Sequence, residues 1–203
     1  MEKSFDHKLN TIKWIGIITM LIDHMGYFLF PQLLWMRVIG RIAFPCFLYG
    51  IIEGTKRTKN YKKYIIRLLI LGVISMPITP NTLNVIFLLA LFSLSIKYKK
   101  YFIVFLLLSI PVEYGVYGML FGWGIYWMKE YNRDQGILFS IIIQFIMGVS
   151  VQAFSLMALP LFLGNIRIKL PKVSKYFFLR VLPAASRNLN IHCDLDKSIE
   201  IEK

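Results

Sequence analysis

Long apolar segments recur along almost the whole chain, with only short polar connections between them. Of the 203 residues, 57% are hydrophobic, and the mean hydropathy is +0.59. A soluble domain of this length does not have enough interior to bury so large an apolar fraction. The sequence therefore predicts an all-α fold, a polytopic transmembrane bundle of about eight membrane helices. We expect one bundle over residues 1–166 and a charged cytoplasmic tail over residues 167–203.

The apolar segments place the expected membrane helices at residues 12–30, 33–52, 63–79, 83–96, 101–112, 115–128, 136–150 and 151–164. Several are shorter than the ~20 residues of an upright span, and the last two form either one long helix or a re-entrant pair. Pro31, Pro77 and Pro80 lie near expected helix ends, where a missing N–H does least harm. The first segment has no small-residue cleavage site, so we expect a membrane span there rather than a signal peptide.

Lysine and arginine are concentrated in alternate connections of this expected bundle. They lie before the first helix, between the second and third, between the fourth and fifth, between the sixth and seventh, and in the tail. The positive-inside rule then predicts a multi-pass protein with both termini in the cytoplasm. The same distribution accounts for the net charge of +13, so we expect no nucleic-acid partner.

Asp23, His24 and Arg41 lie inside the first two apolar segments, where each ionisable group costs several kcal/mol. At a rise of about 1.5 Å per residue, His24 lies about 9 Å and Arg41 about 12 Å below the outer boundary, so the two side chains share a level. The short Pro31-Gln32 turn makes the two helices neighbours. We therefore predict that these residues form a catalytic centre.

Two arrangements of this centre are open. In one, Asp23 pairs with Arg41 while His24 faces a cavity, and in the other Asp23 orients an imidazole or binds substrate. A neutral imidazole accepts a proton from an attacking hydroxyl or amine, and an arginine stabilises an oxyanion or holds a phosphate or carboxylate. The alternative without chemistry is an Asp23–Arg41 pair that only holds the helices together, with His24 as a bystander.

The basic connection over residues 55–63 is a second candidate site, because it would hold the phosphates of a nucleotide-type ligand. The candidate residues are Arg57, Lys59, Lys62, Lys63 and Arg67. The positive-inside rule would by itself produce much of this charge. Glu53 lies close by in sequence, and we expect it to form an interfacial ion pair with Arg57 or Arg67.

Two further polar groups have simpler interpretations. Glu113 and Tyr114 precede other aromatic residues, so we interpret them as part of an aromatic interface belt, with a substrate contact as the alternative. The residues 192–194 are His, Cys and Asp, but no second ligand cluster lies at a suitable spacing. We therefore expect no metal site.

Several motifs together resemble the TraX family in order and spacing, over residues 10–130. They are Met20-Leu-Ile-Asp-His-Met-Gly26, Gly40-Arg-Ile-Ala-Phe-Pro45, Glu53-Gly54-Thr55, Arg57-Thr58, Tyr64, Arg67-Leu68 and Asn84-Val-Ile-Phe87. The Asp-His and Gly-Arg-Ile-Ala-Phe-Pro elements form the specific part of this signature. The family is named for a conjugative-plasmid membrane protein that N-acetylates the pilin subunit. It looks related to multi-spanning membrane acyltransferases.

The resemblance implies an acetyltransferase in the bacterial cytoplasmic membrane, embedded in the lipid bilayer and using acetyl-CoA as acyl donor. His24 would act as general base and Arg41 as the partner of the donor or the oxyanion, with Asp23 beside them. The basic connection would hold the phosphates of the donor. The acceptor would be an amine or hydroxyl group of an envelope protein, lipid or glycan.

The chain departs from the family pattern at its C-terminal end. The family usually closes with an apolar helix carrying Tyr-Pro-x-His after a Lys-Tyr-Phe-Phe stretch. Here Lys175-Tyr-Phe-Phe178 is followed by a charged segment with no further apolar span. A membrane scaffold that has lost its chemistry is therefore one alternative to the enzyme. A small transporter or channel for an anion or protons, built on the same buried charges, is the other. A homodimer is an open alternative to a monomer.

Overall fold

The computed structural model describes residues 6–76, 83–147 and 151–164, together with Ile168, Leu170, Pro171 and Val173. These residues form helices joined by short turns, and within the described ranges no strand is present. The α-helices are α1 (His7–Phe28), α2 (Leu34–Gly40), α3 (Ala43–Arg57), α4 (Tyr61–Ile74), α5 (Val85–Lys97), α6 (Phe102–Leu108), α7 (Gly115–Glu130), α8 (Arg133–Met147) and α9 (Leu159–Leu163). The 3₁₀ helices η2 (Lys99–Tyr101) and η3 (Val151–Ala158) precede α6 and α9. The predicted all-α class is confirmed.

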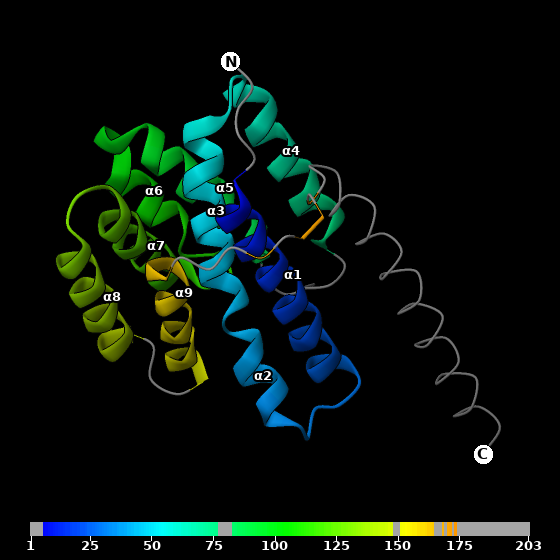
Figure 1. The fold of residues 1–203 in the computed structure, drawn as a ribbon. Coiled ribbons are helices and arrows are strands. Elements are labelled where there is room, and N and C mark those ends of the chain that lie inside the picture. The colour runs from blue at the N-terminus through cyan, green and yellow to red at the C-terminus, as the bar shows by residue number, and fades with distance from the viewer. Residues whose placement is uncertain are drawn as a thin grey trace.

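Each predicted membrane segment contains one of these helices, but the ends and the continuity differ. The segment predicted over residues 33–52 is divided into α2 and α3, and the segment over 151–164 begins as the 3₁₀ helix η3. The last two predicted segments are separate helices that lie side by side (Figure 1), rather than one long helix. Pro77, Pro80 and most of the predicted tail lie outside the described residues.

Polar side chains define the starts of α1, α4 and α5. The N-cap residue accepts a backbone N–H in each case: Asp6 from Leu9 at 3.0 Å, Asn60 from Lys63 at 3.1 Å, and Asn84 from Ile86 at 3.0 Å. Such a cap satisfies an N–H that the helix itself leaves unpaired, and it typically stabilises a helix by about 1 kcal/mol. Asn84 also donates its side-chain amide to the carbonyl of Gly72 at 2.8 Å, which joins α4 to α5.

Pro45 explains the break between α2 and α3. Its ring has no N–H and clashes with the carbonyl four residues earlier, which belongs to Arg41. At the break, the N–H groups of Arg41 and Ile42 bond to carbonyls three residues back, at 3.2 and 3.1 Å. Within the described residues, Leu34–Arg57 is the one helical stretch long and apolar enough to cross a membrane, with 24 residues and a mean hydropathy of 1.3. Shorter apolar helices cover Val85–Lys97 and Ala153–Leu163.

Helices α3, α5 and α7 form the core of the bundle, and the remaining helices pack around them (Figure 1). The largest fully buried apolar side chains of these three helices are Leu48, Ile52, Leu88, Phe92, Met119, Phe121 and Ile125. Around this core, α1 contacts α2 and α3, α4 contacts α5, and α8 contacts α7. The order of the helices in the sequence is therefore largely the order of their contacts.

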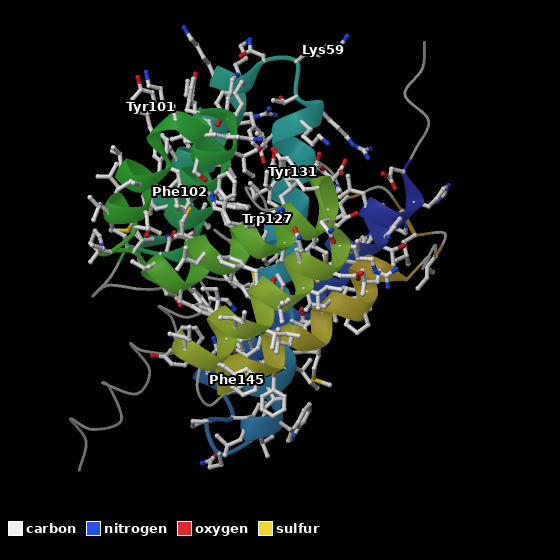
Figure 2. The ribbon with its side chains drawn as sticks, turned by 90° about the vertical axis from the view of Figure 1, so that its left-hand side faces the viewer. Lys59, Tyr101, Phe102, Trp127, Tyr131 and Phe145 are labelled. Atoms are coloured by element: carbon white, nitrogen blue, oxygen red, sulfur yellow. The ribbon has the colours of Figure 1, made fainter. Side chains whose placement is uncertain are left out.

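The connections that carry lysine and arginine meet at one end of the bundle, which we call the basic end. Direct contacts join them: Lys56 with Glu130 at 2.6 Å, Arg57 with Asp6 at 2.6 Å, and Lys99 with the hydroxyl of Tyr131 at 2.7 Å. Figure 2 shows Lys59, Tyr101 and Tyr131 toward this end and Phe145 toward the opposite end. This grouping agrees with the alternation of charged and uncharged connections along the sequence.

The described residues after α9 lie against the first turns of α1. Asn10 donates its side-chain amide to the carbonyls of Leu170 and Pro171, at 3.1 and 3.0 Å, and accepts the N–H of Val173 at 3.0 Å. The indole N–H of Trp14 also donates to Pro171, at 2.7 Å. The beginning of the predicted tail is therefore held against the N-terminal turns of α1, at the basic end of the bundle.

Candidate functional site

Asp23 lies on α1 directly against the backbone of Gly40 at the end of α2. A Cβ added to Gly40 would lie 2.3 Å from both the Cβ and the Oδ1 of Asp23, so a glycine is required for this approach. One turn further along α1, a Cβ added to Gly26 would lie 2.7 Å from the Cβ of Met36. Small residues thus let the two helices cross closely. The prediction that the Asp-His and Gly-Arg motifs share a level is confirmed.

The carboxylate of Asp23 pairs with Arg37 and not with Arg41. Nη1 of Arg37 lies 3.4 Å from Oδ2 of Asp23, and both side chains are partly exposed. Oδ1 of Asp23 is buried and has no hydrogen-bond partner in the described part of the chain. Of the two arrangements left open, the Asp23–Arg41 pair is therefore absent, and Arg37 takes that place.

Arg41 instead contacts Tyr114, at the start of α7. Its Nη1 donates to the hydroxyl oxygen of Tyr114 at 2.7 Å. Nε of Arg41 is buried and has no hydrogen-bond partner among the described residues. The ring of Tyr114 stacks on Phe44, with 4.3 Å between the ring centres and 9° between the planes. One N–H of the guanidinium, on Nη1, is therefore bound to the phenol, and a second N–H, on Nε, is available to a ligand.

Tyr114 has an unusual backbone conformation, with φ 65° and ψ −18°, and it is the one described residue other than glycine with a positive φ. A tyrosine rarely occupies this left-handed region, and such outliers concentrate at functional sites. The preceding connection is held by an isolated bridge between Leu83 and Val112 and by the N–H of Glu113, which donates to Leu83 at 2.7 Å. These contacts place Tyr114 next to Arg41.

Glu113 belongs to the same polar group. Burial raises the pKa of its carboxyl above the ordinary value, while the N–H of Val85 and the charges of Arg41 and His24 oppose that rise. The nearby Asp23 carboxylate adds to it. The charges of the predicted catalytic residues therefore act on Glu113, which the sequence analysis assigned to an interface belt.

His24 has one ring nitrogen engaged by its own helix. Nδ1 lies 2.8 Å from the carbonyl oxygen of Met20. A carbonyl oxygen only accepts hydrogen bonds, so Nδ1 carries the hydrogen in the neutral ring and Nε2 carries the lone pair. The ring of Phe28 lies beside it, 6.3 Å away between ring centres. This tautomer makes Nε2 the atom that would accept a proton.

The residues predicted to hold donor phosphates lie at the basic end, away from Arg41. The sixteen-residue separation of Arg41 and Arg57 corresponds to roughly 24 Å along a helix. Arg57 forms ion pairs with Asp6 at 2.6 Å and with Glu53, as expected for Glu53. Nε of Arg67 donates to the carbonyl of Lys63 at 3.1 Å, and the side chains of Lys59, Lys62 and Lys63 are exposed. The two predicted groups of site residues therefore lie at different levels of the bundle.

Three residues of the polar centre were not predicted as site residues. Arg37 carries the ion pair expected of Arg41, and Glu113 and Tyr114 come from the connection between α6 and α7. Proline at position 45 was the available signal for the first error, since it breaks the helix four residues earlier. The contact between Arg41 and Tyr114 spans 73 residues, and no local pattern indicates it.

The fold and the site define an all-α protein with a polar centre formed by α1, the α2–α3 break and the start of α7. The model of the TraX family, described as TraX protein, matches residues 8–179. This chain therefore belongs to the TraX family, as its motifs predicted.

Two curated relatives match shorter parts of the chain. A probable fimbrial assembly protein, FimC of serogroup H1 from Dichelobacter nodosus, is 32% identical over 81 residues, or 38% of this chain and 33% of its own length. An uncharacterized protein of Rickettsia prowazekii (strain Madrid E) is 43% identical over 65 residues, or 31% of this chain and 23% of its own length. The matches thus span a third or less of these relatives. No solved structure matches the chain.

Proposed function

We propose that this protein is an integral membrane acetyltransferase that transfers an acetyl group from acetyl-CoA to an amine or hydroxyl group at the cell envelope. The observation that carries this proposal is the polar centre itself. It combines an imidazole with a free Nε2, a guanidinium with an unpartnered buried Nε, and a carboxylate on one level of the bundle. This is the donor and acceptor set that acyl transfer requires.

The outer surface of the bundle supports a position in the membrane. Large apolar side chains are exposed on helices that surround the core: Leu21 at 58%, Val73 at 62%, Ile103 at 68%, Leu138 at 58% and Phe145 at 76%. Water-soluble monomers rarely expose apolar surface on so many sides. A lipid bilayer would cover these faces, with the basic end in the cytoplasm by the positive-inside rule. We extend this to a polytopic bundle in the bacterial cytoplasmic membrane.

His24 would act as the general base. Its Nε2 would accept the proton of the attacking amine or hydroxyl, while the Met20 carbonyl keeps the ring in the required tautomer. Asp23, held by Arg37, would place a carboxylate at the same level of the bundle. Arg41 would stabilise, through the positive charge of its guanidinium, the negative charge that develops on the acyl oxygen.

Acetyl-CoA would enter from the basic end. The exposed ammonium groups of Lys59, Lys62 and Lys63 are available to its phosphates, whereas Arg57 would first have to exchange its ion pairs with Asp6 and Glu53. The acyl arm would then run along α3 toward Arg41. The length of α3 between the two levels supports an extended donor rather than a compact one.

The acceptor is proposed from the relatives and the family. The Dichelobacter nodosus relative is described as a probable fimbrial assembly protein. TraX-family proteins are associated with acetylation of the pilin subunit. These links favour an envelope protein amine, such as that of a pilus or fimbrial subunit, over a lipid or glycan hydroxyl.

The test is acetyl-CoA turnover and binding by the detergent-purified protein, measured as release of the free thiol and as binding of labelled donor. We expect His24→Ala to abolish thiol release while donor binding is retained, because the imidazole acts on the acceptor. Arg41→Ala would reduce both. Arg133→Ala, which alters an exposed arginine at the start of α8, is the control and should match the unaltered chain. The absence of donor binding by the unaltered chain would overturn the proposal.

A further inference from the structure

We propose that Tyr114 is a further catalytic residue of this centre, and that its hydroxyl donates a hydrogen bond to the carbonyl oxygen of the acyl donor. The inference rests on the proposed function, since it assigns a role within the same acyl transfer. It is carried by the contacts and backbone of Tyr114, which no sequence motif of the chain singles out.

The direction of the Arg41–Tyr114 hydrogen bond leaves the phenolic hydrogen available. A guanidinium only donates, so the Tyr114 oxygen accepts the N–H of Arg41 at 2.7 Å. The O–H of the phenol is therefore available to a second acceptor. A neighbouring cation also makes the phenol a stronger donor than an isolated tyrosine.

The hydroxyl stays protonated at neutral pH. Burial raises the pKa of Tyr114 to about 12, although the charge and hydrogen bond of Arg41 favour the ionised form. A neutral phenol offers a hydrogen to an oxyanion, whereas a phenolate would repel it. Tyr114 is thus suited to donate and not to remove a proton.

The position of Tyr114 is fixed from several directions. Phe44 stacks on its ring at 4.3 Å between ring centres, and Tyr117 stacks at 6.4 Å. The left-handed backbone of Tyr114 is followed by a second positive φ, 43°, at Gly115. Strained conformations of this kind persist where the surrounding structure enforces them. A preorganised donor is what stabilises a developing oxyanion most effectively.

The O–H of Tyr114 is therefore the proposed donor, and the guanidinium of Arg41 beside it supplies positive charge. In the proposed step, the nitrogen of the acceptor amine attacks the carbonyl carbon of the thioester, and the carbonyl electron pair moves to the oxygen. The resulting oxyanion accepts the hydrogen bond of Tyr114 and is stabilised by the positive charge of Arg41. His24 Nε2 takes the proton from the nitrogen. Re-formation of the carbonyl expels the thiolate, which receives that proton, so amide and free thiol are the products.

Tyr117 gives a matched control on the same helix. Its hydroxyl donates to Oε1 of Gln144 at 2.8 Å and contacts the hydroxyl of Ser155 at 3.1 Å. It is buried and aromatic like Tyr114, but it has its own partners on the opposite side. Tyr117→Phe removes a buried phenol without altering the Arg41 contact.

The experiment compares Tyr114→Phe and Tyr117→Phe with the unaltered protein in acetyl transfer. We expect Tyr114→Phe to lower kcat about 10²- to 10³-fold with KM for acetyl-CoA unchanged, because the lost bond forms in the transition state. Tyr117→Phe should leave both constants within about threefold. An unchanged kcat in Tyr114→Phe, or a higher KM with an unchanged kcat, would overturn the assignment of Tyr114 alone.

A further variant separates a donor role from loss of structure. Tyr114→His keeps an aromatic ring on Phe44 and a ring N–H, so we expect it to be at least about tenfold more active than Tyr114→Phe. Equal losses in both variants would contradict a donor role. If the unaltered chain transfers no acetyl group, the proposed function and this inference both fail, whereas activity that survives Tyr114→Phe rejects only the inference.

Discussion

The side chain of Asp23 fills the space that a side chain at position 40 would occupy. A Cβ at Gly40 would lie 2.3 Å from the Cβ of Asp23, shorter than any tolerable contact. This contact sets the separation of α1 from α2 and therefore the position of every polar group between them. The close approach of α1 and α2 at Asp23 therefore requires a glycine at position 40.

The substitution Gly40→Ala should destabilise the protein strongly. Overpacking of a close helix contact typically costs about 1–3 kcal/mol, and the clash at Gly40 is with the Cβ of Asp23 and not only with its flexible end. Gly50→Ala is the matched control, because a Cβ at Gly50 meets nothing within 4 Å. It should be neutral or slightly stabilising, since alanine favours helices by about 1 kcal/mol over glycine. Thermal unfolding in detergent compares them, and equal melting temperatures would contradict the clash.

Arg37 and Arg41 should respond differently to neutralisation. Arg37→Gln leaves the partly buried carboxylate of Asp23 without its cation, with an expected loss of about 1–2 kcal/mol. Adding Asp23→Asn should recover much of that loss, because the uncompensated charge is removed. Arg41→Gln should be unaffected by Asp23→Asn. Unfolding free energies of the single and double variants give the two coupling energies, and a larger coupling for Arg41 than for Arg37 would contradict the pairing.

Asp6, which caps α1 and pairs with Arg57, should make the protein less stable as the pH falls into the acid range. Burial opposes ionisation of Asp6, but the N–H of Leu9 and the guanidinium of Arg57 together hold its pKa below the ordinary value. A lowered folded pKa contributes stability above the unfolded value of about 3.9, and that contribution is lost as pH falls through the folded pKa. Asp6→Asn keeps the cap but removes this dependence. The melting temperatures of the parent and of Asp6→Asn should converge as the pH is lowered. Two curves that stay parallel would contradict the prediction.

Ionisation of Glu113 should change stability with pH in the opposite direction to Asp6. Burial raises its pKa, so the folded state binds the proton more tightly than the unfolded state. Stability is therefore highest below the unfolded value of about 4.3 and falls as pH rises through the raised folded pKa. Glu113→Gln should be more stable than the parent at neutral pH and equal to it in acid. A variant that is less stable at neutral pH would show that the ionised carboxylate is stabilising.

The positions of the helices were largely predictable, because runs of apolar residues bounded by polar turns are a local property. The two ends of the bundle were also predictable from the alternation of lysine and arginine. The division of the second predicted helix was not anticipated, although Pro45 carries the cause. Its ring displaces the carbonyl of Arg41, and the helix changes direction at the residue that the site depends on.

The partners of the polar residues were predicted less well. Asp23 and Arg41 share a level, as expected, yet the partner of Asp23 is Arg37 and the partner of Arg41 is Tyr114. The spacing of residues along a helix gives the depth of each one. It does not give the direction in which a side chain leaves the helix axis once the helix is broken. The placement of Glu113 within reach of these charges has the same origin, since it depends on how the connection before α7 folds.

The sequence by itself determined that the chain forms apolar helices, where its basic connections lie and which ionisable motif residues share a level of the bundle. These properties follow from composition and periodicity, which act over a few residues. Only the tertiary structure decided which arginine meets Asp23 and that Tyr114 adopts a left-handed backbone beside Arg41. The reason is physical, because hydrogen bonds between distant segments depend on helix rotation and close packing, and neither is encoded in any local pattern.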